Sequence, residues 1–173
     1  FIGSEGTLGI VTRAVLRLQP AMPDTRTALV ACPSFDAMTV LLAHMRQTLG
    51  GELSAFEAMW RSHYRLLTEQ SGRHPPPVGS ESPFYVIIES PAIDADRHGS
   101  RFAQALESAF EAGLLAGAAI AQSDAQRDGL WAIREDIEGL VHLLSPLMTF
   151  DVSLPISDME DYVARVETTL QEQ

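Results

Sequence analysis

Apolar and polar residues follow two different periods along the chain. A period of two, which is typical of strands, occurs imperfectly at residues 9–20 and again at 52–60, and short, mostly apolar runs that also predict strands occur at residues 26–33, 83–91 and 117–123. A period close to four, which is typical of helices, occurs at residues 34–51 and 98–115. Ser34 is suited to cap the first of these helices. The segment GRHPPPVGSES, residues 72–82, predicts an exposed loop.

The order of these elements between residues 26 and 122 indicates the fold. Strand, helix, strand, strand, helix and strand follow one another, which is the β-α-β-β-α-β order of a ferredoxin-like fold. We therefore predict an α+β protein: an antiparallel sheet with helices on one face, extended by an extra strand and helices. MTFDVSLP, residues 148–155, alternates as that extra strand should. The order of elements alone says nothing about function.

Two capping boxes predict the additional helices. Ser123 with Gln126, and Ser157 with Glu160, place a serine three residues before a Gln or Glu, so a helix should begin just after each serine. The first helix, continuous to residue 144, would carry on its apolar face Leu130, Ile133, Ile137, Leu140 and Leu144. A second stripe beside that face contains Arg127, Trp131, Arg134 and Glu138.

The charge of the chain restricts its partners. Its 173 residues include 23 Asp and Glu against 12 basic residues, all of them Arg, which gives a net charge of −11. Such a charge repels phosphates and anionic lipids, so we exclude nucleic acid and membrane surfaces as partners. The absence of Lys excludes Schiff-base and lysine-base catalysis within this chain. No apolar run approaches the ~18 residues of a membrane span.

Cys32 and the first residue bear on the setting of the protein. Cys32 is the single cysteine and ends the apolar run ALVAC, so it fits a buried thiol in a reducing compartment, and we expect a cytoplasmic location. Because the chain starts at Phe1 without Met, we expect it to be part of a longer protein. A homo-oligomer is left open.

Few residues form a motif that carries chemistry. The five His are scattered and none has a metal-ligand spacing, so we assign no metal site and no catalytic residue. Gly3, Gly6 and Gly9 allow positive φ or a close approach of the backbone, which suits either a structural loop or a ligand cradle. Arg134 carries a planar fork suited to a carboxylate, but it could also pair with Glu138 one turn later. Spacing alone favours that pair.

Three segments together resemble one known family. They are FIGSEGTLGIVT at residues 1–12, LWAIRE at 130–135 and FDVSLP at 150–155. In this order and at these distances they resemble the FAD-linked 2-hydroxyacid oxidase and dehydrogenase family, which includes the glycolate oxidase catalytic subunit, D-lactate dehydrogenase and D-2-hydroxyglutarate dehydrogenase. The resemblance spans nearly the whole chain.

The resemblance implies domains and site residues. Residues 1–20 would be the last motif and strand of an FAD-binding domain, and residues 21–173 a substrate or cap domain, incomplete at its C-terminus. The residues on the FAD side would be Ser4, Glu5, Gly6, Thr7, Gly9 and Ile10. Arg134 would bind the carboxylate of a small 2-hydroxy acid, lactate-like or glycolate-like, which overturns the pair with Glu138. The partners implied are that acid and the missing FAD-binding domain of the same chain.

Two departures from the family pattern limit what it implies. Polar or cationic residues of the hydroxyglutarate-type relatives fall where this chain has Glu138 and Thr149, which argues against recognition of a second carboxylate. The family's metal-binding His pair and downstream acid have no match before Gln173. We therefore expect the isolated chain to lack FAD and turnover. The alternative is a free-standing ferredoxin-like module that binds or senses a small acid; an alkyl-glycerone-phosphate synthase is disfavoured, since no Arg or His cluster suits a phosphate.

Overall fold

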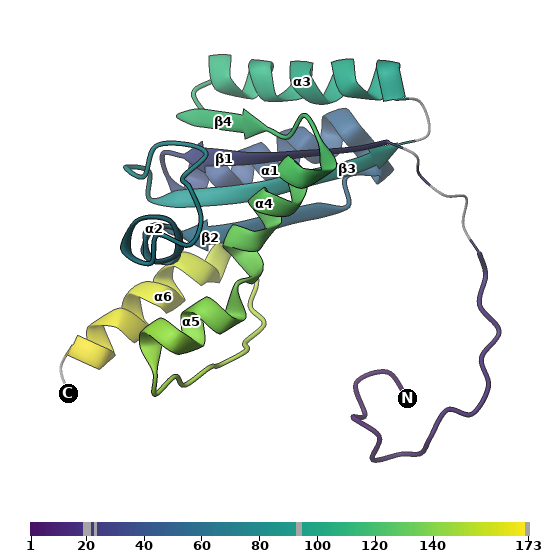
Figure 1. The fold of residues 1–173 in the computed structure, drawn as a ribbon, viewed down its shortest axis with the longest axis vertical. Helices are drawn as coiled ribbons and strands as arrows, with labels where there is room; N and C mark the ends of the chain where they lie inside the picture. Colours follow the sequence, from purple (N-terminus) through teal and green to yellow (C-terminus); the bar gives the residue numbers. More distant parts are fainter. Residues whose placement is uncertain (19–21, 23, 93–94, 172–173) are drawn as a thin grey trace.

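A four-stranded antiparallel sheet forms the centre of the molecule. The computed structural model describes residues 1–18, 22, 24–92 and 95–171. The strands are β1 (Asp24–Cys32), β2 (Ala55–Trp60), β3 (Phe84–Ala92) and β4 (Gly117–Ile120). Their order is β2-β3-β1-β4, and every neighbouring pair is antiparallel (Figure 1). The predicted α+β class and ferredoxin-like arrangement are confirmed.

One face of the sheet is covered by the two helices of the ferredoxin-like unit. They are α1 (Phe35–Leu49) and α3 (Ala95–Glu111). Ser34 caps α1 as predicted, because its hydroxyl accepts a hydrogen bond from the Ala37 amide at 3.0 Å. Cys32 is fully buried in this core, and burial raises the pKa of its thiol to about 12. The core includes Val30, Val86, Ile88, Leu41, Met45, Phe102 and Leu106.

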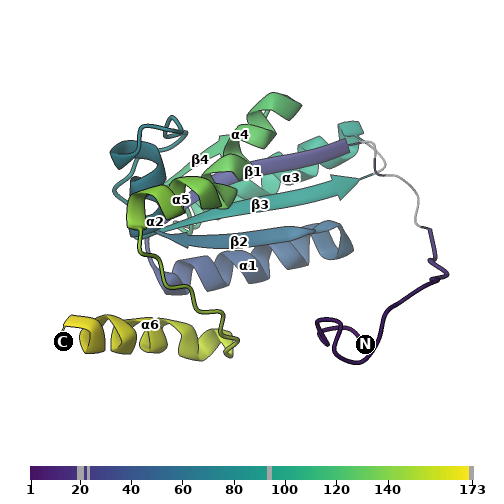
Figure 2. The same ribbon diagram turned by 60° about the horizontal axis from the view of Figure 1, so that its bottom comes forward.

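The other face of the sheet is covered by α2 (Arg61–Arg65) and α4 (Asp124–Glu135). A π-helical turn, Leu66–Gln70, follows α2. Figure 2 shows α1 and α4 on opposite sides of the sheet. The rings of Tyr64 and Tyr85 stack with their centroids 3.8 Å apart. Their hydroxyls donate hydrogen bonds to the carbonyls of Val78 and Gly79, in the loop between the π-helical turn and β3. This second core holds α4 against the strands.

The predicted continuous helix over residues 124–144 is wrong, because it breaks at Asp136. The break separates α4 from α5 (Ile137–Leu144). Asp136 has a non-helical ψ of 68°, and its carboxylate accepts the Gly139 amide at 2.8 Å, which caps α5. The predicted apolar face therefore divides: Leu130 and Ile133 are buried on the sheet, whereas Ile137 of α5 is 59% exposed.

Two predicted features of the C-terminal part are also wrong. Residues 148–155 form no strand, and among the described residues they pair with none of the four strands of the sheet. The last helix, α6 (Ile156–Gln171), begins before Ser157, so this serine is not its cap; its hydroxyl donates instead to Asp158. Alternation and capping spacing are local signals, whereas pairing needs a partner strand elsewhere in the chain.

The N-terminal segment stands apart from the sheet and its helices. Figures 1 and 2 both show it extending away from them. Residues 9–18 form no strand, contrary to the prediction; residues 19–20 of that prediction lie outside the described residues. Within the described chain, the hydrogen bonds of residues 1–18 join only Phe1, Ser4 and Thr7 to one another.

Removal of residues 1–18 should therefore leave the rest of the chain folded. We expect a midpoint of thermal unfolding within about 2 °C of that of the complete chain, because the deleted segment contributes nothing to either core. Circular dichroism during heating measures this. A clear loss of stability would show that the segment packs on the domain in solution.

Candidate functional site

α4 places two functional side chains, Trp131 and Arg134, over the sheet. They are three residues apart and therefore lie on the same side of the helix, about 4.5 Å apart along its axis. Beneath them the sheet presents two carboxylates, Glu57 on β2 and Glu89 on β3. These two acids lie on the same face of the sheet, because Ala55 pairs with Glu89 and Glu57 with Ile87. Each α4 side chain meets one of these acids.

Arg134 contacts Glu57 and not Glu138. Its Nη2 lies 3.4 Å from Glu57 Oε2, and the two side chains are 38% and 44% exposed. At that distance and exposure the pair is weak. In the part of the chain that the structure describes, no interaction engages Nε or Nη1 of Arg134. The guanidinium is thus held at one corner and open on the others, and it can still bind a carboxylate.

Trp131 is fixed by Glu89, one turn before Arg134. Its Nε1 donates a hydrogen bond to Glu89 Oε2 at 2.8 Å, and the Thr27 hydroxyl donates to the same oxygen at 2.9 Å. Thr27 lies directly opposite Glu89 on β1. Because these partners come from β1 and β3, they tie α4 to the two central strands.

His63 of α2 contacts α4 beside Arg134. Its Nε2 donates to the carbonyl oxygen of Ile133 at 3.0 Å. Burial lowers the pKa of His63, the hydrogen bond to Ile133 opposes this shift, and the nearby charge of Arg134 adds to it. His63 therefore stays neutral near pH 7 and adds no second cation beside Arg134.

Asp136 anchors the end of α4. It accepts Arg73 Nε at 2.6 Å, Arg73 Nη2 at 3.2 Å and His74 Nε2 at 2.9 Å, in addition to the Gly139 amide. Its side chain is only 9% exposed. Arg73 holds the pKa of Asp136 well below its usual range, and Gly139 and His74 act in the same direction. The loop after α2 is thereby fastened two residues beyond Arg134.

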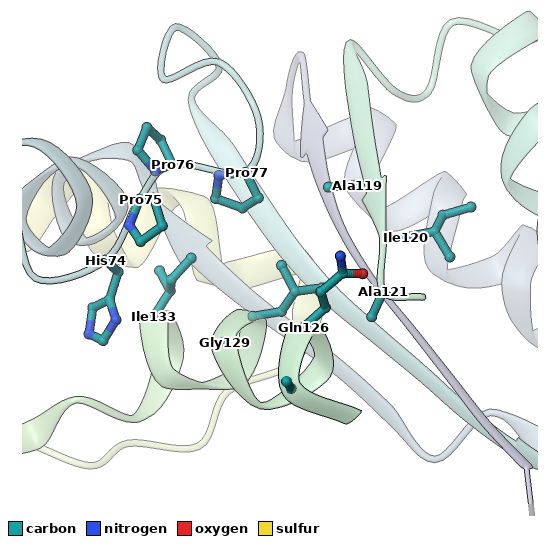
Figure 3. A pocket seen from close by; sticks show the side chains of 12 residues that line it. His74, Pro75, Pro76, Pro77, Ala119, Ile120, Ala121, Gln126, Gly129 and Ile133 are labelled. Carbon is teal, nitrogen blue, oxygen red and sulfur yellow. The ribbon is translucent and has the colours of Figure 1, made fainter. Parts of the chain in front are cut away.

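A pocket lies on another flank of α4. Its volume is about 470 Å³, and Figure 3 shows its two walls: the prolines Pro75–Pro77 on one side, and on the other the end of β4 with the residue after it, Ala119–Ala121. α4 contributes Gln126, Gly129 and Ile133 between them. The lining is mostly apolar and contains neither Trp131 nor Arg134. Glu138 lines a different hollow together with Arg73, and Arg134 pairs with Glu57 rather than with Glu138.

The glycine segment is not brought near Arg134. All six predicted FAD-side residues belong to the extended N-terminal part, far from α4 in both ribbon views: Ser4, Glu5, Gly6, Thr7, Gly9 and Ile10. Gly3 and Gly6 have φ near +80°, and Glu5, which is not a glycine, has φ of 50°. A Cβ at Gly3 or Gly6 would meet no atom within 4 Å, so conformation rather than space favours glycine there.

Sequence reasoning missed the acids beneath α4 and the anchor at its end. Glu57 and Glu89 each occupy a core-facing position in an otherwise apolar strand pattern, and this was the available signal. Asp136 and its partner Arg73 left no local signal, since 63 residues separate them. Among the described residues, no three His, Cys, Asp or Glu side chains form a group that could hold a metal ion.

Comparison with known proteins assigns the family. The protein-family model for the C-terminal domain of FAD linked oxidases matches residues 21–173. The chain belongs to this family. A D-2-hydroxyglutarate dehydrogenase of Xanthomonas citri pv. viticola is 36% identical over 99% of this chain and 35% of its own length. The mitochondrial D-2-hydroxyglutarate dehydrogenase of Arabidopsis thaliana is 32% identical over 94% of this chain and 29% of its own.

This FAD-linked oxidase domain spans about a third of the length of the relatives it matches. A third relative, the putative mitochondrial D-lactate dehydrogenase of Schizosaccharomyces pombe, is 31% identical over 94% of this chain and 31% of its own length. The expected cytoplasmic location is contradicted, because the Arabidopsis and yeast relatives are mitochondrial proteins. Among the described residues, no helix is both long and apolar enough to cross a lipid bilayer.

Proposed function

We propose that this chain is the substrate-side domain of a flavin-dependent dehydrogenase that oxidises a small 2-hydroxy acid, lactate-like or glycolate-like, to the 2-oxo acid. In this proposal Arg134 binds the substrate carboxylate. The observation that carries it is the state of that guanidinium: Glu57 engages one amino group at 3.4 Å, and 38% of the side chain is exposed. A fork held on a packed helix is suited to orient a carboxylate for reaction.

The implied cofactor is FAD, and the N-terminal segment fits it in one respect. The backbone at Gly3 and Gly6 is open to a ligand, since a Cβ there would meet nothing within 4 Å. Ser4, Glu5, Gly6, Thr7, Gly9 and Ile10 would hold the cofactor together with the FAD-binding domain. When bound, FAD supplies the acceptor for the hydride of the substrate. The part of this chain is to bind and orient the acid.

An activity assay of the full-length protein tests this proposal. Purified protein should show flavin absorbance and should reduce an artificial electron acceptor with D-lactate, glycolate or D-2-hydroxyglutarate. Residues 1–173 alone should show no turnover, because most of the length of the relatives is missing. Binding of a hydroxy acid by the full-length protein without flavin or turnover would favour the binding module instead.

A further inference from the structure

The Glu57 carboxylate on β2 contacts the guanidinium of Arg134. An arginine side chain has four rotatable bonds, so a guanidinium on a helix surface samples many orientations unless a partner holds it. Glu57 Oε2 lies 3.4 Å from Nη2 and is the hydrogen-bond and ion-pair partner of Arg134 among the described residues. Nη2 keeps a second N–H, and Nε and Nη1 stay open, so this contact leaves the other N–H groups of the guanidinium free to bind a ligand.

The fit between helix and sheet supports this role. Trp131 and Arg134 are separated by one helical turn, and Glu89 and Glu57 lie diagonally across two paired strands. Trp131 and Glu89 form a hydrogen bond of 2.8 Å, and the Thr27 hydroxyl also donates to Glu89. α4 is thus docked in one register, which brings Arg134 to Glu57. His63, bound to the Ile133 carbonyl at 3.0 Å, contacts the same turn of α4.

We propose that Glu57 is a positioning residue for the reaction: it orients the Arg134 guanidinium toward the substrate carboxylate. This inference rests on the proposed function of Arg134. Both side chains are more than a third exposed, so the pair contributes little to stability, and its value lies in the orientation of the fork. Loss of Glu57 should therefore weaken substrate binding while leaving the fold intact.

The test uses the full-length enzyme with whichever of D-lactate and D-2-hydroxyglutarate it oxidises faster. Glu57→Ala should raise KM on the order of tenfold and change kcat less than about threefold, because a misdirected fork binds the carboxylate poorly. Glu57→Gln keeps an oxygen acceptor at the same place and should stay within about threefold of wild type. Glu107→Ala, an exposed acid on α3, is the matched control and should match wild type.

A double-mutant cycle shows whether Glu57 acts through Arg134. In the Arg134→Ala background, Glu57→Ala should change kcat/KM less than about twofold, since the group it orients is gone. A Glu57→Ala enzyme within twofold of wild type in KM, or one that loses the same factor in both backgrounds, would overturn the inference while leaving the role of Arg134 in place. An unaltered Arg134→Ala enzyme would overturn the role of Arg134 and this inference together.

Discussion

Replacement of Arg134 by Ala in the full-length enzyme should lower kcat/KM for the hydroxy acid on the order of 10²-fold or more. A charge-assisted, bidentate contact between a guanidinium and a carboxylate is among the strongest polar contacts, and it orients the substrate as well as binding it. Arg134→Lys should recover only part of the loss, because an ammonium keeps the charge but not the planar fork. Steady-state kinetics of the two variants measures this.

Arg127 offers a matched control on the same helix. It lies two turns before Arg134 in the same stripe, but Asp124 and Asp128 already bind its guanidinium at 2.9 and 3.1 Å. Arg127→Ala should therefore stay within about twofold of wild type in kcat/KM. Flavin content should be unchanged in all three variants, since none touches the glycine segment. If the kcat/KM of Arg134→Ala also stays within twofold of wild type, Arg134 does not bind the substrate carboxylate as proposed.

The sequence was sufficient for the parts of the fold that local patterns determine. The strands and the two helices of the ferredoxin-like unit are visible in their own short segments of sequence, and Ser34 caps its helix through the next turn. The pattern could not show the break at Asp136, because the apolar period of Leu130, Ile133 and Ile137 runs through it without a gap. At the break, Asp136 also binds Arg73 from a distant loop, a contact that local periodicity does not show.

For the candidate site too, the sequence could predict some parts and not others. The role of Arg134 was predicted from the family resemblance. Its helix was predicted from the apolar period and from the capping serine. Its partner Glu57 is 77 residues away, and the contact exists only because β2 pairs with β3 and α4 packs above them. Strand register decides such a contact, since a shift of one residue would turn Glu57 to the other face of the sheet. The pair with Glu138, which spacing alone favoured and the resemblance overturned, does not form, since α4 ends at Glu135, before that residue.

Replacement of Asp136 by Asn should destabilise the domain and change its response to acid. At neutral pH we expect the midpoint of thermal unfolding to fall by roughly 5 °C, because the amide cannot accept Arg73, His74 and the Gly139 amide at once. Asp128→Asn, an exposed acid on α4, serves as the control and should have little effect. Thermal melts of residues 1–173 measure both variants.

The acid response follows from the lowered pKa of Asp136 in the folded state. A carboxyl whose pKa is lower in the folded than in the unfolded state stabilises the fold fully above its unfolded pKa of about 4, and this contribution is lost as the pH falls toward the folded pKa. Wild type should therefore lose more unfolding free energy than Asp136→Asn between pH 5 and pH 3, so the gap between them should narrow on acidification. Urea titrations across this range measure the gap. A constant gap would mean that the Asp136 carboxylate is not held by Arg73 in solution, and that another contact fixes the end of the helix that carries Arg134.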